Sequence, residues 1–192
     1  MMQSYRLDHD WFSAPLPDNV VLGDRNWIYS SFAFRHYYSQ QSVGLQTGHD
    51  TGIYNGTFFN LGPNGRVEIG NYCTLVGVII CTDCSVVIRD YTFIAHDVVL
   101  ADSTVAFPFV DSSENWESNS SSKEMGSPIG ILIEENAWIG AKAILLKGTH
   151  IGAGSIVGAC SVVSSVVPPY TIVVGNPARV VRHLDKHTNY YG

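Results

Sequence analysis

Charged side chains are scarce in this 192-residue chain: Asp, Glu, Lys and Arg make up 15% of it, where globular domains average about 25%. The 11 Lys and Arg residues against 17 Asp and Glu residues leave a net charge of −6, which argues against nucleic acid as the main partner. The same shortage excludes a disordered chain and a charged helical bundle. The length indicates one domain, or a small domain with an appendage.

Long apolar runs are also missing, and the chain has only one closely spaced pair of cysteines. No run is long enough to span a bilayer, and the first residues, MMQSYRLDHDWF, lack the apolar segment of a secretory signal. We therefore expect a cytoplasmic protein without membrane insertion. Cys81 and Cys84 form one CTDC, a weak zinc or redox signal without a second pair. We expect no metal, and we expect Cys73 and Cys160 to fill small core positions in a reduced chain.

The sequence instead contains a six-residue repeat. From residue 133 onward, one aliphatic residue occurs every six positions: Ile133, Ile139, Leu145, Ile151, Val157 and Val163. Four positions after each of them stands a residue that is small in five of six cases: Ala137, Ala143, Thr149, Ser155, Ser161 and Val167. This period matches neither a 3.6-residue helix nor a two-residue strand alternation.

The repeat predicts a coil with three flat sides, each side being one six-residue unit of strand and turn. The aliphatic residue points into the prism, and the small residue lies at the corner, where a larger side chain does not fit. Glycine follows the aliphatic residue at Gly140, Gly152 and Gly158, where we expect it to supply a positive φ at the turn. Three units, about eighteen residues, complete one coil, and stacked coils pair like a parallel sheet.

The same phase appears earlier with interruptions, at Ile88, Ile94 and Leu100, at Ile69 and Leu75, and at Leu22 and Ile28. We therefore predict an all-β protein, a parallel β-helix of about five coils over residues 20–175. An N-terminal segment, 1–19, precedes it and a C-terminal tail, 176–192, follows it. Residues 101–130 form a Ser-rich excursion loop, too long for an ordinary turn and typical of functional or disordered loops.

The run EENAWIGAKAILLKGTHIGAGSIVGACSVVSSVVPPYTIVVGNPARVVR resembles the C-terminal half of hexapeptide-repeat acyltransferases. The acetyl-CoA-dependent sugar O- and N-acetyltransferases are the most similar, including the maltose, galactoside and xenobiotic groups. The resemblance implies a left-handed parallel β-helix and a homotrimer. It also implies transfer of an acetyl group from acetyl-CoA, as co-substrate, to a hydroxyl or amine of a sugar or nucleotide-sugar.

Such a transfer needs a base with a pKa near neutrality, a function that histidine commonly fills. Among seven histidines, His96 occupies an outward turn directly before the excursion loop, whereas His150 points outward along a coil side. IAHDVVLAD, which contains His96 and Asp97, resembles the catalytic segments of the UDP-N-acetylglucosamine acyltransferase of lipid A synthesis and of UDP-sugar N-acetyltransferases. In both groups a His followed by Asp at this position is the general base, so the resemblance assigns that role to His96.

One departure from the family pattern concerns this base. In the maltose and xenobiotic groups the catalytic His lies within the loop, but residues 101–130 contain no His. Either His96 acts as the general base, or another residue does, or catalysis has been lost.

The resemblance also carries over positions for coenzyme A. Ala141 and Ala159 match backbone donors and acceptors for the pantetheine arm, and Trp138 matches a residue lining the acyl or cofactor groove. Ser164 keeps a small hydroxyl of the pattern, whereas Ser165 stands where the family often has Lys. Arg179 and Arg182, after GNPA, match residues that approach the nucleotide phosphates.

Acceptor recognition is expected from the excursion loop and from outward residues one coil away, where Tyr54, Asn55 and Asn60 have suitable side chains. Sugars are bound by carboxylates, amides and stacking aromatics, and Asp102, Asn115 and Trp116 have this chemistry. The alternative of a solvated loop tip explains the Ser-rich stretch equally well.

Three further functions remain open from the sequence. A catalytically silent trimeric scaffold would account for the missing loop His and the missing Lys. A zinc carbonic anhydrase on the same β-helix needs three converging His, but the repeat region offers only His96 and His150. An acyltransferase of the same chemistry could instead use acyl carrier protein as donor.

Overall fold

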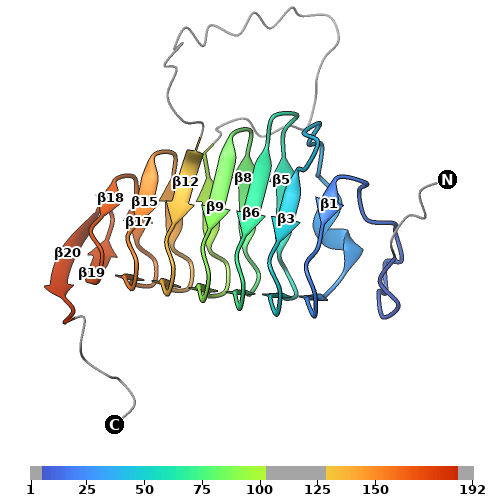
Figure 1. Ribbon diagram of the computed structural model, residues 1–192. Coiled ribbons are helices and arrows are strands. Elements are labelled where there is room, and N and C mark those ends of the chain that lie inside the picture. Colours follow the sequence, from blue (N-terminus) through green and yellow to red (C-terminus); the bar gives the residue numbers. More distant parts are fainter. Residues whose placement is uncertain (1–5, 103–128, 186–192) are drawn as a thin grey trace, which may run out of the picture.

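The computed structural model describes residues 6–102 and 129–185, which form a parallel β-solenoid with three sides (Figure 1). Strands of successive coils align into three sheets, named here faces 1, 2 and 3. Face 1 contains β1 (Val20–Val21), β3 (Leu45–Thr47), β6 (Arg66–Ile69), β9 (Ser85–Ile88), β12 (Ile129–Ile133), β15 (Thr149–Ile151) and β18 (Val166–Val167).

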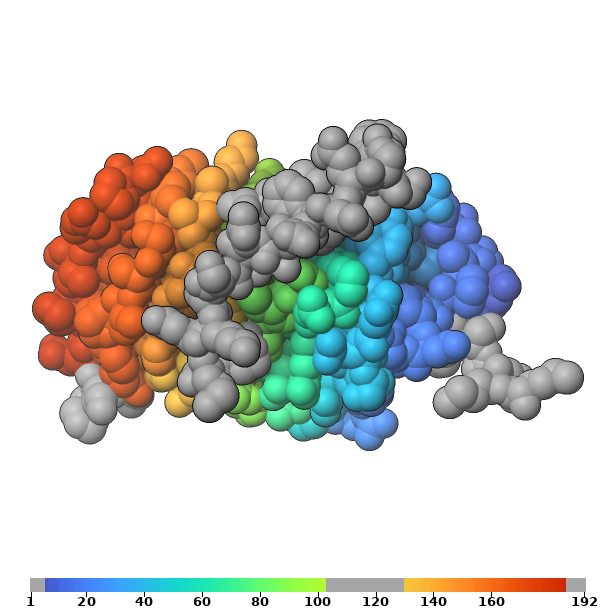
Figure 2. Space-filling view, turned by 90° about the horizontal axis from the view of Figure 1, so that it is seen from above, coloured from blue at the N-terminus to red at the C-terminus, as the bar shows by residue number. Residues whose placement is uncertain are grey.

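Faces 2 and 3 complete each coil. Face 2 contains β2 (Trp27–Ile28), β4 (Gly52–Ile53), β7 (Thr74–Leu75), β10 (Phe93–Ile94), β13 (Trp138–Ile139), β16 (Ile156–Val157), β19 (Thr171–Gly175) and the antiparallel β20 (Ala178–His183). Face 3 contains β5 (Phe58–Leu61), β8 (Ile79–Thr82), β11 (Val99–Ala101), β14 (Ile144–Leu146) and β17 (Val162–Val163). The colours run along the molecule in chain order (Figure 2), so residues one coil apart in sequence are spatial neighbours.

The β-helical architecture predicted from the repeat is confirmed, with more coils than expected. Five coils have a strand on every side. In the coil before them a 3-10 helix, η1 (Ser31–Phe34), takes the third side, and β18 and β19 begin a further coil after them. The solenoid therefore has about six turns rather than five.

The predicted inward and corner positions are confirmed in the core. All six aliphatic positions of the regular repeat, from Ile133 to Val163, are at most 2% exposed. The six corner positions, from Ala137 to Val167, are at most 3% exposed. Thus the corner lies inside the packed prism, and the small side chains there are a consequence of the limited space.

The reason for the repeat glycines differs from the one expected. Gly140, Gly152 and Gly158 are not among the residues with positive φ. Instead, a Cβ at Gly140 would lie 2.6 Å from the Ala159 amide nitrogen of the next coil, and one at Gly152 would lie 2.5 Å from the Pro169 nitrogen. These glycines therefore permit close stacking of coils.

Each turn between faces 1 and 2 contains one residue with a positive φ. These positions are Arg25, Asp50, Tyr72, Tyr91, Asn136, Gly154 and Tyr170. Six of the seven carry a side chain, so the turn is imposed by the stacked coils at some conformational cost.

One of the two cysteine expectations is wrong. Cys73 is 1% exposed and fills a corner position as predicted. Cys160 is exposed at a turn with a φ of 59°, one residue before Ser161, which fills the inward corner position. All four cysteines are free thiols.

The described residues contain no helix long and apolar enough to cross a membrane. The excursion loop leaves face 3 after β11 and returns at β12 on face 1.

Two adjacent leucines provide a test of the inward assignment. Leu145 is fully buried, whereas Leu146 is 37% exposed. We expect Leu145→Ala to lower the free energy of unfolding by about 2–5 kcal/mol, because it leaves a cavity between coils. The Leu146→Ala control should cost within about 0.5 kcal/mol. Chemical denaturation monitored by circular dichroism measures both, and equal costs would contradict the assigned register.

Candidate functional site

The turn between faces 2 and 3, called here the 2–3 corner, holds His96. Ile94 ends β10 pointing inward, and the chain turns at His96 and Asp97 before β11. The backbone of this turn is held on both sides: the His96 carbonyl accepts from the Lys142 amide at 2.9 Å, and the Asp97 amide donates to the Gly77 carbonyl at 3.1 Å. A fixed backbone therefore carries an exposed imidazole, as the sequence predicted.

The His96 side chain has no hydrogen-bond or ionic partner among residues 6–102 and 129–185. Asp97 has a φ of 59° and is exposed, and its carboxylate makes no hydrogen bond to the imidazole of its neighbour. The two adjacent side chains therefore do not form a dyad in the isolated chain. Both ring nitrogens of His96 lack a hydrogen-bond partner in the described parts of the chain.

Ala141 and Ala159 lie on the same corner, one and two coils beyond His96. The Ala141 carbonyl accepts from the Cys160 amide at 2.9 Å, so this carbonyl is engaged in coil stacking. The amide N–H groups of Ala141 and Ala159 have no partner within the described parts of the chain. Because backbone donors are obligatory hydrogen-bonding groups, this row is ready to receive acceptor atoms of a ligand.

Trp138 stands beside this corner on face 2. It pairs in register with Phe93 of the preceding coil, and the two rings meet edge to face with centroids 6.2 Å apart. Trp138 is 54% exposed, so its indole forms a wall of the corner that is open to solvent.

The remaining cofactor candidates lie elsewhere. Ser164 follows β17 on the turn leading to face 1, at a different edge of the prism. Arg179 and Arg182 are exposed on β20, next to β19 at the C-terminal end of face 2. From β10 to β20 there are four strand spacings, about 19 Å in all at roughly 4.8 Å each. The structure therefore brings His96, Trp138, Ala141 and Ala159 together. Arg179 pairs with Val174 near the 2–3 end of β19, whereas Arg182 pairs with Ile172 toward the other end of that strand.

Of the three acceptor candidates in the excursion loop, only Asp102 lies within the described residues; Asn115 and Trp116 lie outside them. Asp102 is 6% exposed. Its carboxylate accepts hydrogen bonds from the Thr82 hydroxyl and from the Asp83 amide at 3.2 Å. Burial raises the pKa of Asp102, and these hydrogen bonds oppose the rise. The acceptor-binding role of all three residues stays a prediction.

Lys142 and the pair Glu134–His150 were not selected from the sequence. Lys142 is an exposed cation one coil from His96, and its position in the unit after Ile139 was the available signal. His150 Nε2 lies 2.7 Å from Glu134 Oε1, while Glu134 Oε2 accepts from the Ala153 amide at 2.8 Å. The hydrogen bond with His150 lowers the pKa of Glu134. This pair projects from face 1, away from the 2–3 corner.

Within residues 6–102 and 129–185, no group of three or more His, Cys, Asp or Glu side chains is placed to hold a metal ion. His96 and His150 lie on different sides of the prism, so they do not converge within one chain.

The buried carboxyl group of Asp102 gives a pH-dependent prediction. Since its pKa in the folded chain lies above the ordinary 3.8, the folded chain binds this proton more tightly than the unfolded chain. Stability is therefore lost as the pH rises from about 4 through the raised pKa, and the loss persists at neutral pH.

We expect Asp102→Asn to raise the melting temperature at pH 7 and to remove this part of the pH dependence. Asp83→Asn, a change at the partly exposed neighbouring carboxylate, is the matched control and should not raise it. Thermal unfolding between pH 3 and 8 measures both. A lower melting temperature for Asp102→Asn at pH 7 would contradict the assignment of a strained buried carboxylate.

Both the sequence and the fold are similar to those of known proteins. Residues 130–165 match the family model described as bacterial transferase hexapeptide (six repeats). A Schizosaccharomyces pombe protein with a provisional acetyltransferase name is 34% identical over 122 residues, covering 63% of this chain and 52% of that protein. The galactoside O-acetyltransferase of Escherichia coli K12 is 32% identical over 136 residues, covering 70% of this chain and 62% of that enzyme. The chain thus spans about half the length of these curated relatives.

Two solved structures share the fold. A variant of AntD, an N-acyltransferase from Bacillus cereus in complex with dTDP and coenzyme A, has a TM-score of 0.58 at 19% identity. The match covers 86% of this chain and 84% of that chain. A hexapeptide-repeat acetyltransferase of Vibrio cholerae in complex with acetyl coenzyme A has a TM-score of 0.55 at 23% identity, covering 81% and 76%. At these identities the likeness shows the fold alone.

Proposed function

We propose that this chain transfers an acetyl group from acetyl-CoA to a hydroxyl or amine of a small sugar or nucleotide-sugar. Its residues 130–165 match the bacterial transferase hexapeptide model, and it folds as a three-sided β-solenoid. One observation carries the proposal: among residues 6–102 and 129–185, the His96 imidazole and the amide N–H groups of Ala141 and Ala159 have no hydrogen-bond partner, and all three lie on the same corner. The acetyltransferase names of the relatives and the coenzyme A bound to structural neighbours support it.

The reaction follows from these groups. Neutral His96 takes the proton of the acceptor hydroxyl or amine as the acceptor oxygen or nitrogen attacks the thioester carbonyl. The carbonyl becomes an oxyanion, which a backbone N–H of the corner stabilises. When the oxyanion collapses, the C–S bond breaks, the acetyl group remains on the acceptor, and the His96 imidazolium returns the proton to the thiolate of coenzyme A.

Acetyl-CoA, the donor, would bind in an extended form along the 2–3 corner. The pantetheine arm would lie along the 2–3 corner, where the Ala141 and Ala159 N–H groups meet its amide carbonyls and Trp138 forms a side wall. Arg179 and Arg182 on β20, about 19 Å beyond β10, would meet the nucleotide phosphates. Lys142 adds a further exposed cation close to the row.

We extend the proposal to a homotrimer. Face 2 presents large apolar side chains to solvent: Trp27 is 45% exposed, Phe93 41% and Trp138 54%. A second copy covering part of this face would bury such side chains, and it would convert the open corner at His96 into a cleft between subunits. The four free thiols suit a reducing cytoplasmic setting.

Two observations support the scaffold alternative: residues 101–130 contain no His, and Ser165 stands where the family often has Lys. The carbonic anhydrase alternative is weaker, because His96 and His150 occupy different sides of the prism.

The role of His96 is tested by His96→Ala with His150→Ala as control. We expect His96→Ala to reduce kcat for acetyl transfer by about 10²-fold or more, because the acceptor proton then has no base. His150→Ala, on face 1, should leave the rate unchanged. Released thiol measures the rate, and calorimetry with coenzyme A checks that binding persists. Unchanged transfer by His96→Ala would remove it from the mechanism, and no binding of coenzyme A by the wild-type chain would favour the scaffold.

The phosphate contacts are tested by the double change Arg179→Ala and Arg182→Ala. We expect the KM for acetyl-CoA to rise by about tenfold, since charge-assisted contacts to phosphate are lost, while kcat stays the same. Acetyl-pantetheine, which lacks the nucleotide, is the matched substrate and should show no change in KM. An equal rise in KM for both donors would mean that the double change disturbs the β19–β20 hairpin rather than phosphate contacts.

A further inference from the structure

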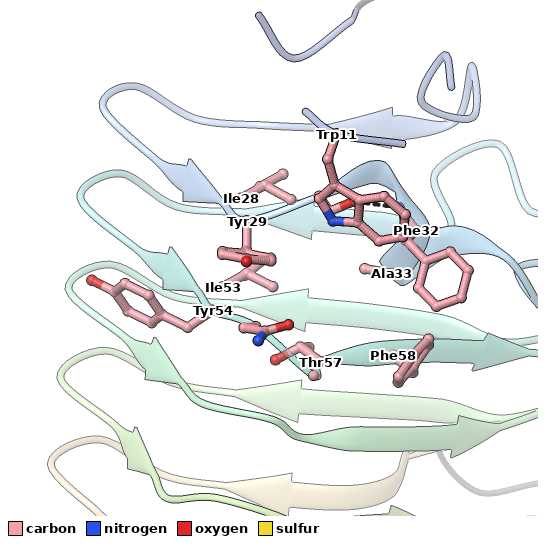
Figure 3. A pocket seen from close by; sticks show the side chains of 12 residues that line it. Trp11, Ile28, Tyr29, Phe32, Ala33, Ile53, Tyr54, Thr57 and Phe58 are labelled. Carbon is pink, nitrogen blue, oxygen red and sulfur yellow. Dashed lines mark hydrogen bonds between the residues drawn. The ribbon is translucent and has the colours of Figure 1, made fainter. Parts of the chain in front are cut away.

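A pocket of about 260 Å³ opens on the same 2–3 corner, toward the N-terminal end of the solenoid (Figure 3). Its wall consists mainly of aromatic rings from three segments: Trp11, Tyr29, Phe32, Tyr54 and Phe58. For scale, an apolar cavity of about 150 Å³ holds benzene. The pocket is therefore large enough for a single planar ring with substituents.

The rings form two walls. Phe32 contacts Phe58 and Trp11 with centroids 5.4 and 5.5 Å away, and this cluster forms one wall, as Figure 3 shows. Tyr29 and Tyr54 belong to adjacent coils on the other side, and each is about 40% exposed. Tyr54 lies over Gly52, where an added Cβ would come within 2.4 Å of the ring. The absence of a side chain at Gly52 in β4 therefore leaves room for the Tyr54 ring.

The N-terminal segment is anchored where it closes the pocket. The Asp10 carboxylate accepts hydrogen bonds from the Ser30 hydroxyl at 2.6 Å and the Ser31 amide at 2.9 Å. Burial alone would raise the pKa of Asp10, but these and neighbouring hydrogen bonds lower it to about 2. The carboxylate is therefore ionised at neutral pH and holds the adjacent Trp11 over η1.

The polar groups of the pocket suit an uncharged ligand. No Asp, Glu, Lys, Arg or His is among its lining residues. The hydroxyls of Tyr29 and Tyr54 and the amide of Asn55 have no hydrogen-bond partner within the described parts of the chain. They are thus available to orient a ring that carries a few hydrogen-bonding atoms.

The pocket lies close to His96 along the 2–3 corner. Only one coil, through Val76, Gly77 and Val78, separates the lining residues Asn55 and Thr57 from the His96 turn. Gly77 has a φ of 61°, and a Cβ there would contact the Asn55 carbonyl and the Asp97 amide at 3.5 and 3.6 Å. Because this glycine has no side chain, position 77 places no side-chain atoms between them. The separation is about 10 Å, two strand spacings.

We propose that this aromatic pocket binds an uncharged planar ring attached to the acceptor, while the acceptor hydroxyl or amine lies at His96. The inference rests on the proposed acetyl transfer and names its substrate class: a sugar bearing either an aromatic aglycone or a nucleobase. In an aryl glycoside, one sugar ring and its linking atoms fill the distance between the pocket and the imidazole, whereas a nucleotide-sugar has a ribose and a diphosphate as well between its base and its sugar. Both sources present the same flat apolar face to the rings of the pocket.

The test compares acceptors that differ only in the ring. Initial rates with acetyl-CoA are measured for 4-nitrophenyl galactoside, methyl galactoside and a uridine diphosphate sugar. Trp11→Ala and Tyr54→Ala should each raise the KM for a ring-bearing acceptor about tenfold and leave kcat unchanged. The KM for methyl galactoside should not move. Tyr91→Ala, at an exposed aromatic on the corner between faces 1 and 2, is the control and should change neither constant.

A second measurement separates this inference from the proposed function. Calorimetry with 4-nitrophenyl galactoside or uridine, without acetyl-CoA, is performed on the wild type, His96→Ala and Trp11→Ala. Binding to the first two and about tenfold weaker binding to the third support the pocket even if no acetyl transfer is detected. Which of the two ligands binds identifies the source of the ring. Transfer activity with equal KM values for aryl and methyl acceptors, or ring binding that Trp11→Ala leaves unchanged, overturns the inference.

Discussion

Stacking of each coil's backbone directly on the next is the interaction on which the rest of this protein depends. Parallel strands pair at a spacing of about 4.8 Å, and no coil has freedom to move away from its neighbour. This spacing explains the glycines at 140, 152 and 158, whose missing Cβ atoms leave room for the backbone of the next coil. It also explains the small buried corner residues and the shortage of charged side chains.

The same stacking creates the functional corner. Turn residues of successive coils lie in a row, so His96, Ala141 and Ala159 become neighbours although 63 positions separate the first from the last. A ligand lying along this row meets a fixed series of backbone donors and one imidazole. Such preorganisation needs no movement of the chain to assemble the groups. The aromatic pocket extends the row toward the N-terminus, where the fold provides side chains larger than the repeat allows.

The regular part of the fold could be predicted from the sequence because period and burial coincide there. Leu145 and Ala143 show this: both were assigned inward from their spacing alone, and both are fully buried. Outward exposure of His96 followed from the same phase. The role of Gly140 could not be inferred, because the distance to the next coil depends on stacking, which a single unit does not reveal.

The first coils could be predicted only in outline. η1 replaces a strand there, and Phe59 and Leu45 fill the interior at positions the repeat had not marked. The pocket escaped prediction for a similar reason. Trp11 and Tyr54 are 43 positions apart and meet only because Asp10 anchors the N-terminal segment against η1. Burial of Asp102 also depends on contacts between coils, with Thr82 and the Asp83 amide.

The central claim is that the 2–3 corner is where acetyl-CoA and the acceptor meet. The most direct measurement is a crystal structure of the full chain with coenzyme A. The account predicts that the pantetheine arm follows the corner past Ala159 and Ala141, with its thiol beside the His96 imidazole. Coenzyme A bound on face 1 beside Glu134 and His150, or away from the corner altogether, would contradict it.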